Sequence, residues 1–347
     1  MTILQNKINI KFELSMKYSY KKMLKINSLL FVVIFCCKSI SAQQTQNFNL
    51  LRSNLSLLNP ANVDMDFYRY NYWNKVSANY KSAWAGFEGA PKTIQLNGEF
   101  LFPPTNNRKL GYVIGGNLLS DKAGRLSHTS ATFRYSTIIT SDIEEGGLSI
   151  GTNVSVSQYS LSTKDITADN YSKLANYLDD FKSIIPNLGI GLFYYKIFKG
   201  SGYNSSENIL YGGISVPNLF SLGNADEQFF TPVQHNYVNI GFINGLRDES
   251  FVELSSWTKL QESGVWISDL RFTYSHRSKV NMVIGYNSEN FVTFGFGVRT
   301  FTVGEASRIH INYGGQLPIG TGLFRNYGVS HEIGFAISFG DTSSSYY

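Results

Sequence analysis

Near its C-terminus the chain reads His331-Glu332-Ile333-Gly334-Phe335-Ala336-Ile337-Ser338-Phe339-Gly340. The odd positions are nearly all large and apolar, whereas the even positions are small or polar. A period of two is the pattern of a β-strand whose two faces meet different media. The polar face of a soluble sandwich would carry Lys, Glu and Thr, because it meets bulk water. The small polar residues found here fit the crowded interior of a barrel better. The stretch therefore predicts a strand of a transmembrane β-barrel.

The same alternation recurs along the chain, for example in residues 147–156, 280–287 and 292–299. We count about fourteen such segments and expect an all-β fold, a single antiparallel transmembrane barrel with long extracellular loops. The expected strands begin near Tyr72, Pro91, Leu110, Ser127, Glu145, Pro186, Glu207, Val233, Glu249, Gly264, Ser278, Asn290, Ser307 and Gly328.

An even strand count places both ends of the barrel on the periplasmic side, so connections after odd-numbered strands are expected to be extracellular. The three longest connections, residues 158–185, 217–232 and 317–327, all fall there. Connections after even-numbered strands, such as residues 246–248 and 275–277, are shorter. Short periplasmic turns and long outer loops are the usual asymmetry of these barrels.

The composition favours the same compartment. Aromatic residues make up 15% of the chain, with 25 Phe and 22 Tyr, whereas charged residues make up 16% against about 25% in ordinary globular domains. After residue 42 no segment approaches the ~20 continuous apolar residues that a membrane helix needs. This balance disfavours a soluble exported sandwich.

The N-terminal region reads as a secretory signal. Met16 is the better start, four lysines form a basic region, and residues 29–37 form an apolar core too short to span a bilayer. We expect residues 1–42 to be removed ahead of Gln43. A lipoprotein is the alternative, but the residues before Cys36 and Cys37 are not the small ones that lipid modification requires.

Removal of this region changes the charge balance. The formal net charge of +5 includes seven lysines and one glutamate before residue 43, so the remainder holds 23 basic and 24 acidic residues, a net charge of −1. No basic cluster suited to nucleic acid is left, so we expect no nucleic-acid partner. Both cysteines also leave, which excludes disulfides and thiolate metal sites from the mature chain.

Several stretches form a recognisable set. Leu58-Asn59-Pro60-Ala61 precedes the first expected strand, and residues 84–93 read WAGFEGAPKT. Further stretches are residues 110–112, 121–124, 186–195, 212–219 and 330–333. Together, over residues 46 to 340, they resemble the PorP/SprF family of the type IX secretion system. Its W-x-G-F-x-G-A-P-x-T motif is the most specific match.

The resemblance implies an outer-membrane barrel in a bacterium of the Bacteroidetes. Such a barrel works with other secretion components and helps secreted cargo, in gliding members a large adhesin, to reach or stay on the cell surface. One departure is clear: the family usually continues N-P-A with Y-A-G, whereas Asn62-Val63-Asp64 follows here.

The segment of residues 43–71 admits two interpretations. Asn59, Pro60 and Ala61 either form a plug in the barrel mouth, as in similar hatch-bearing proteins, or an ordinary periplasmic lead-in. The barrel itself is expected over residues 72–347.

Candidate partner contacts lie in the expected outer loops, because binding residues tend to sit on loops of a rigid scaffold. Trp84 and Phe87 end the first strand, where amphipathic rings favour the membrane interface. Gly86 and Gly89 permit a tight reversal. This motif is either a structural turn or a contact with a secreted partner. The full set of candidates is Trp84, Phe87, Glu88, Tyr171, Leu174, Leu178, Phe181, Phe220, Phe229 and Phe230.

The longest loop has a pattern of its own. Tyr171, Leu174, Leu178 and Phe181 fall at helical spacing after Asp169-Asn170, which could cap a helix N-terminus. This pattern predicts either a short helix that covers the barrel mouth or a helix that docks a partner.

Catalytic chemistry is not expected. The five histidines are scattered, and none has a second metal ligand at a suitable spacing. A phospholipase would need a serine in register with His310 and Asn312, and none is evident. We therefore expect no enzymatic activity, no cofactor and no metal.

Two functions remain. The first is a secretion component that presents rigid outer loops to cargo in the outer membrane. The second is an outer-membrane channel for a small solute, which would need charged residues lining the lumen. The inward positions of the alternating segments are expected to be mostly small and neutral, which favours the first function.

Overall fold

The computed structural model describes residues 48–50, 54–70, 72–104, 109–162, 181–199, 207–222, 234–246, 248–261, 264–302, 307–319 and 328–341. Two short helices come first in this part of the chain, α2 (Leu55–Leu58) and α3 (Met65–Tyr70). The strands that follow are β1 (Tyr72–Ala85), β2 (Lys92–Phe102), β3 (Leu110–Ala123), β4 (Leu126–Ile139), β5 (Gly146–Leu161), β6 (Phe181–Phe198), β7 (Asn208–Ser221), β8 (His235–Gly245), β9 (Phe251–Gln261), β10 (Trp266–His276), β11 (Val280–Asn287), β12 (Phe291–Thr302), β13 (Ser307–Pro318) and β14 (Val329–Asp341).

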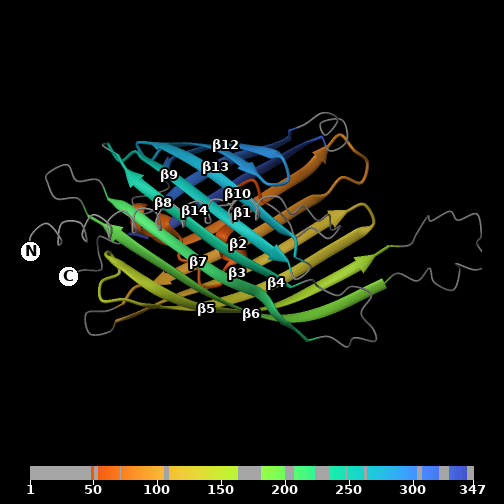
Figure 1. Ribbon diagram of the computed structural model, residues 1–347, viewed down its shortest axis with the longest axis horizontal. Coiled ribbons are helices and arrows are strands. Elements are labelled where there is room, and N and C mark those ends of the chain that lie inside the picture. The colour runs from red at the N-terminus through yellow and green to blue at the C-terminus, as the bar shows by residue number, and fades with distance from the viewer. Residues whose placement is uncertain are drawn as a thin grey trace, which may run out of the picture. The chain divides into compact units, whose positions relative to one another are not determined.

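The fourteen strands form one closed antiparallel barrel (Figure 1). Each strand pairs with its neighbours in sequence, and β1 closes the ring by pairing with β14. Tyr72 lies opposite Asp341, so the barrel begins and ends at one edge. We call this the inner edge, because both ends of a bacterial single-chain barrel lie on the periplasmic side; the opposite edge is the outer edge. The predicted fold class is confirmed.

Strand starts agree with the alternation to within two residues at every strand except β6. That strand was expected near Pro186 but begins at Phe181, because β5 continues to Leu161 and pairs with it there. The prediction of a helix over residues 171–181 is therefore wrong for Phe181, which is the first residue of β6. Tyr171, Leu174 and Leu178 lie outside the described residues. The three longest connections still follow odd-numbered strands: residues 162–180, 222–234 and 319–328.

The outward face of the barrel is apolar, as the alternation predicts. On β2, the side chains of Ile94 and Leu96 are 54% and 50% exposed, whereas those of Thr93 and Gln95 between and beside them are buried. Large apolar side chains exposed in this alternating way are suited to lipid. No helix among the described residues has the length and apolar character to span a membrane.

The interior differs from the expectation of small neutral side chains, which is wrong. Large charged residues point inward and are buried: Lys75, Lys81, Glu99, Arg134, Glu253, Lys259, Asp269, Arg271 and Glu332. Towards the inner edge the lumen also has a hydrophobic core, in which Ile138, Phe193, Tyr195 and Phe251 pack with residues from before β1. Both departures have one physical reason, which is that the lumen is occupied by chain rather than by water.

Candidate functional site

The described residues before β1 lie inside the barrel. We call residues 48–50 and 54–70 the plug. Its side chains Ala61, Val63, Met65 and Phe67 are almost wholly buried and pack on the inward faces of the strands. A second cluster joins Leu55 and Leu58 of α2 to Tyr237 and Trp257 of the wall. Asn59, Pro60 and Ala61 thus lie inside the barrel, against the inward faces of its strands.

Helix α3 holds the plug at the inner edge. The Tyr68 hydroxyl lies 2.8 Å from that of Tyr195, and the two rings stack. The Arg69 guanidinium donates to the Ser250 carbonyl and lies 4.3 Å over the Phe251 ring. Because Ser250 lies in the connection between β8 and β9, these contacts tie the plug to the inner edge on the side opposite β1.

The Asn59-Pro60-Ala61 segment docks on inward-facing glycines of three adjacent strands. A Cβ atom added to Gly151 of β5 would lie 2.5 Å from the Ala61 nitrogen. One added to Gly191 of β6 or Gly213 of β7 would lie 2.1 and 2.5 Å from the Asn59 side-chain amide. Gly151 therefore lets the plug backbone approach the wall closely, and Gly191 and Gly213 leave room for the Asn59 side chain.

Polar contacts fix the same segment. Asn59 donates from Nδ2 to the Leu192 carbonyl at 2.9 Å and accepts at Oδ1 from the Ala61 amide at 2.9 Å. The Ser215 hydroxyl donates to the Leu58 carbonyl at 2.6 Å. Asn59 thus connects the turn of the plug to the backbone of β6.

Substitution of Asn59 by alanine is expected to lower the free energy of unfolding by about 1–2 kcal/mol, since two buried hydrogen bonds are lost. Urea unfolding in detergent, followed by circular dichroism, measures this. Asn244→Ala is the matched control, because Asn244 is exposed at the inner end of β8, and a change within about 0.5 kcal/mol is expected there. Equal effects of the two substitutions would contradict the docked position of Asn59.

Buried ion pairs join the plug to the wall. Lys75 of β1 lies 2.6 Å from Asp64, and Arg299 of β12 lies 3.3 Å from Asp66. Charges buried in this way must be paired to be tolerated. The two pairs anchor Asp64, just before α3, and Asp66, in the first turn of α3, to β1 and β12 of the wall.

Arg134 of β4 connects the plug to a neighbouring strand. Its guanidinium donates to the carbonyls of Pro60 and Asn62 at 3.2 and 2.9 Å. The same group lies 2.9 Å from the Glu99 carboxylate of β2, close enough for an ion pair although not oriented for a hydrogen bond. Arg134 therefore holds both a plug turn and a neighbouring strand.

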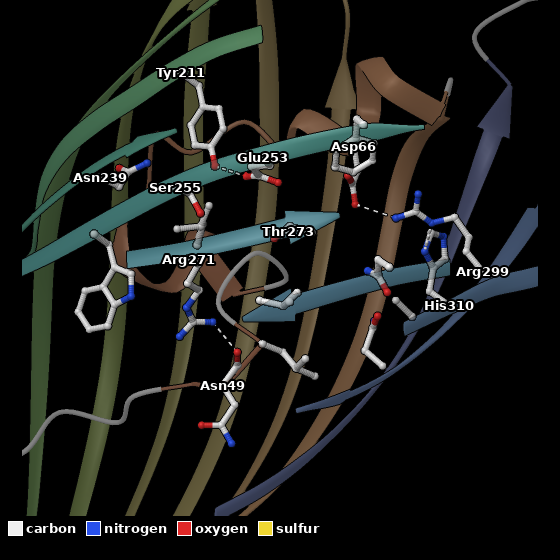
Figure 2. A pocket seen from close by; sticks show the side chains of 18 of the residues that line it. Asn49, Asp66, Tyr211, Asn239, Glu253, Ser255, Arg271, Thr273, Arg299 and His310 are labelled. Carbon is white, nitrogen blue, oxygen red and sulfur yellow. Dashed lines mark hydrogen bonds and ion pairs between the residues drawn. The ribbon is translucent and has the colours of Figure 1, made fainter. Parts of the chain in front are cut away.

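The start of the plug is held nearer the outer edge. The Glu332 carboxylate of β14 accepts hydrogen bonds from the Asn49 and Leu50 amides at 2.5 and 3.2 Å. Arg271 of β10 donates to the Asn49 carbonyl (Figure 2). It also donates to the Phe48 carbonyl and pairs with Asp269. The amides at the start of the plug are thus bound by a carboxylate of β14, and the carbonyls by a guanidinium of β10.

A cavity of about 80 Å³, lined by both polar and apolar side chains, lies between the plug and the wall formed by β7 to β14 and β1 (Figure 2). Its lining includes Tyr211, whose hydroxyl donates to Glu253 at 2.5 Å, and the Arg299–Asp66 pair. Three buried donors in its lining have no acceptor among the described residues, namely the side-chain nitrogens of Asn49, Asn239 and Trp257. A cavity of this size and polarity has room for several water molecules.

The Trp84–Thr93 motif forms the connection at the outer edge between β1 and β2. Trp84 has φ +53° where the β1–β14 register shifts, and its amide lies 3.4 Å from the Ser330 hydroxyl. Gly86 and Gly89 have φ +102° and +72°, conformations that glycine adopts without strain. The Gly89 carbonyl accepts from the Gly124 amide, which joins this connection to the β3–β4 turn.

The motif leaves its apolar tip in solvent. Phe87 is 47% exposed, and its ring lies beside Gly328 just before β14. Glu88 is also exposed. The outer edge therefore presents an aromatic side chain on a connection that is fixed to both of its neighbours.

The other candidate contacts are more scattered. Phe220 is 56% exposed near the outer end of β7. Phe181 is the first residue of β6. Tyr171, Leu174, Leu178, Phe229 and Phe230 lie outside the described residues.

The sequence reasoning missed the charged residues that hold the plug. A usable signal was present, because Lys75, Ser77, Asn79 and Lys81 alternate along β1 at inward positions. Two lysines at the polar positions of a strand indicate that the lumen contains counter-charges. The partners themselves, such as Asp64, lie on a segment with no strand pattern.

Comparison with known proteins identifies the family. The family of type IX secretion system membrane proteins PorP/SprF matches residues 40–337. No curated protein matches the sequence.

Several solved structures are similar to the barrel at low sequence identity. A FadL homologue of Pseudomonas aeruginosa has 12% identity and a TM-score of 0.43, over 82% of this chain and 92% of that chain. The toluene transporter TodX of Pseudomonas putida has 10% identity and a TM-score of 0.44, over 83% and 93%. The translocator domain of the autotransporter NalP from Neisseria meningitidis has 11% identity and a TM-score of 0.39, over 77% and 88%.

The family match covers most of the chain and includes the N-P-A segment, the glycines on which it docks and the Trp84–Thr93 motif. The chain belongs to the PorP/SprF family of type IX secretion system membrane proteins, and it is an outer-membrane β-barrel of that system.

Proposed function

We propose that this barrel assists the export or surface anchoring of specific cargo proteins, such as gliding adhesins, by binding them at its outer edge. It acts as a fixed platform without catalysis, while its inner edge meets other secretion components. The observation that carries the proposal is the plug, which is held by wall residues on β1, β4, β6, β10, β12 and β14. A lumen occupied in this way leaves the two edges as the surfaces for a protein partner.

The exposed Phe87 supports a contact at the outer edge. Aromatic side chains that stand on rigid connections are typical anchors of protein interfaces. The connection that bears Phe87 is braced by the Gly89–Gly124 hydrogen bond and by the packing of its ring beside Gly328. Little conformational entropy would therefore be lost when a partner covers this side chain.

Gentle crosslinking of intact cells followed by purification of the barrel tests the proposal. A large surface protein and components of the secretion machinery should be recovered with the wild-type chain. Phe87→Ala should lower the recovery of the surface protein about tenfold, as loss of an interface anchor does. Phe133→Ala is the matched control, because Phe133 is 57% exposed on the lipid-facing side of β4.

The alternative function, a channel for a small solute, draws support from the cavity beside the plug. It predicts conductance of the intact protein in a planar bilayer without any protein partner. Conductance together with unchanged crosslinking in Phe87→Ala would favour the channel and contradict the platform.

A further inference from the structure

Two lysines lie directly opposite each other at the outer edge of the barrel. Lys92, the first residue of β2, pairs in register with Lys122 near the end of β3. Both side chains are exposed. Like charges at directly opposed positions of an antiparallel pair destabilise the sheet, so this arrangement calls for an anion between them.

Both lysines belong to the lipid-facing side of their strands. Residues 92, 94 and 96 of β2 are exposed while 93 and 95 are buried, and residues 118, 120 and 122 of β3 are exposed in the same way. Below the lysines, towards the middle of the barrel, this surface carries Ile94, Leu96 and Leu118, each at least 50% exposed. The surface is therefore cationic at the edge and apolar beneath it.

The described chain does not supply the anion. Among the described residues, no carboxylate pairs with either ammonium group. Asp121 is next to Lys122 in sequence but faces the other side of β3, where it accepts a hydrogen bond from Thr93 at 2.6 Å. Glu88 is exposed on the preceding connection without an ion pair to Lys92. A third cation, Arg125, is exposed in the turn that ends this hairpin.

The place of the pair in the membrane defines the anion. Long lysine side chains at the end of a transmembrane strand extend to the headgroup layer. The outer edge faces the outer leaflet, in which phosphorylated glycolipids carry their phosphates above their acyl chains. Phosphate is a good acceptor for two ammonium groups, and charge-assisted hydrogen bonds of this kind are strong.

We propose that Lys92 and Lys122 form a binding site for the phosphate of an outer-leaflet glycolipid, whose acyl chains lie on Ile94, Leu96 and Leu118. The lipid neutralises the two opposed lysines and covers the apolar surface below them. Because Gly89 in the Trp84–Thr93 connection is hydrogen-bonded to Gly124 in the β3–β4 turn, the bound lipid braces the same corner of the outer edge.

The full chain in lipid nanodiscs tests this site, with phosphorylated lipid A and enzymatically dephosphorylated lipid A as the two probes. Native mass spectrometry of the released protein measures the fraction that retains one lipid. Wild-type protein should retain the phosphorylated form about tenfold or more over the dephosphorylated form. Lys92→Gln with Lys122→Gln should abolish this preference. Lys109→Gln with Lys279→Gln, two exposed lysines near the inner edge, is the matched control and should keep it.

Equal retention of the two lipids by the wild-type protein, or an unchanged preference in the Lys92/Lys122 double variant, would overturn the proposal. Inorganic phosphate at millimolar concentration is a separate arm; if it displaces the lipid completely, the site binds free anions and not a glycolipid. If the double variant does not show the heat-modifiable gel mobility of a folded barrel, each single Lys→Gln variant is measured and should lose part of the preference. Failure here leaves the cargo proposal unaffected, because that proposal is tested at Phe87.

Discussion

Replacement of Arg134 by methionine is expected to lower the free energy of unfolding by about 3–5 kcal/mol, because the Glu99 carboxylate would remain buried without a cationic partner. Arg134 and Glu99 are only 3% and 2% exposed. The substitution also removes the donors to the Pro60 and Asn62 carbonyls. Urea unfolding in detergent, followed by far-ultraviolet circular dichroism, measures the loss.

Lys199→Met is the matched control for this prediction. Lys199 pairs with Glu144 at the same 2.9 Å, but both side chains are about half exposed. The hydrogen bond to the Glu144 carboxylate raises the pKa of the Lys199 ammonium, yet water screens such a pair, and a loss of at most about 1 kcal/mol is expected. Glu99→Gln added to Arg134→Met should recover part of the loss. Equal small losses for both single variants would mean that water reaches Arg134.

Substitution of Gly151 by valine is expected to displace the N-P-A turn and to cost about 3 kcal/mol, at the upper end for overpacking. A Cβ atom there would lie 2.5–2.6 Å from backbone atoms of Pro60 and Ala61. Backbone cannot move aside by a change of rotamer, so the plug itself must shift. The midpoint of thermal unfolding and the rate of protease cleavage within residues 54–70 both report this change.

Gly116→Val provides the comparison. A Cβ atom at Gly116 on the lipid-facing side of β3 would meet nothing closer than the Thr132 carbonyl oxygen, at 3.5 Å. Valine is favoured over glycine in strands, so stability should stay the same or rise. If Gly151→Val is tolerated as well as Gly116→Val, with no added cleavage of the plug, the docking of Ala61 on β5 is wrong.

The barrel wall could be predicted from the sequence because its information is local. Alternation over a few residues, as in residues 331–340, indicates which side chains share a face. The pattern is clear because the face that meets lipid carries large apolar side chains. This information placed thirteen of the fourteen strand starts within two residues. Alternation did not locate the start of β6. Phe181 belongs to the strand because it pairs with Leu161, and the sequence of residues 181–185 does not alternate.

The interior could not be predicted in the same way, because its contacts join distant residues. Glu332 binds the amide of Asn49, and Arg134 binds the carbonyl of Asn62. Nothing near Glu332 in the sequence distinguishes it from a residue facing water. The family motif containing Asn59 left a plug and a periplasmic lead-in equally open. Its docking surface on Gly151, Gly191 and Gly213 becomes visible when β5, β6 and β7 lie side by side.

This physical link explains why the matched stretches are spread along the chain. Asn59 lies in the N-P-A stretch, Gly191 in residues 186–195, and Gly213 and Ser215 in residues 212–219. The structure brings these three stretches together at one contact. Gly191 and Gly213 are therefore explained by the close approach of Asn59.

The most direct test of the occupied lumen is a disulfide between the plug and β1. Asn79 donates from Nδ2 to Oδ1 of Asn54 at 3.0 Å, and both residues are buried. A chain with Asn54→Cys and Asn79→Cys, oxidised mildly in native outer membranes, should yield a linked pair of peptides that contain positions 54 and 79. The control pair Asn54→Cys and Ala78→Cys should not, because residue 78 faces away from the lumen. If the 54–79 pair stays unlinked and both thiols react with a water-soluble maleimide, the N-terminal segment does not lie inside the barrel.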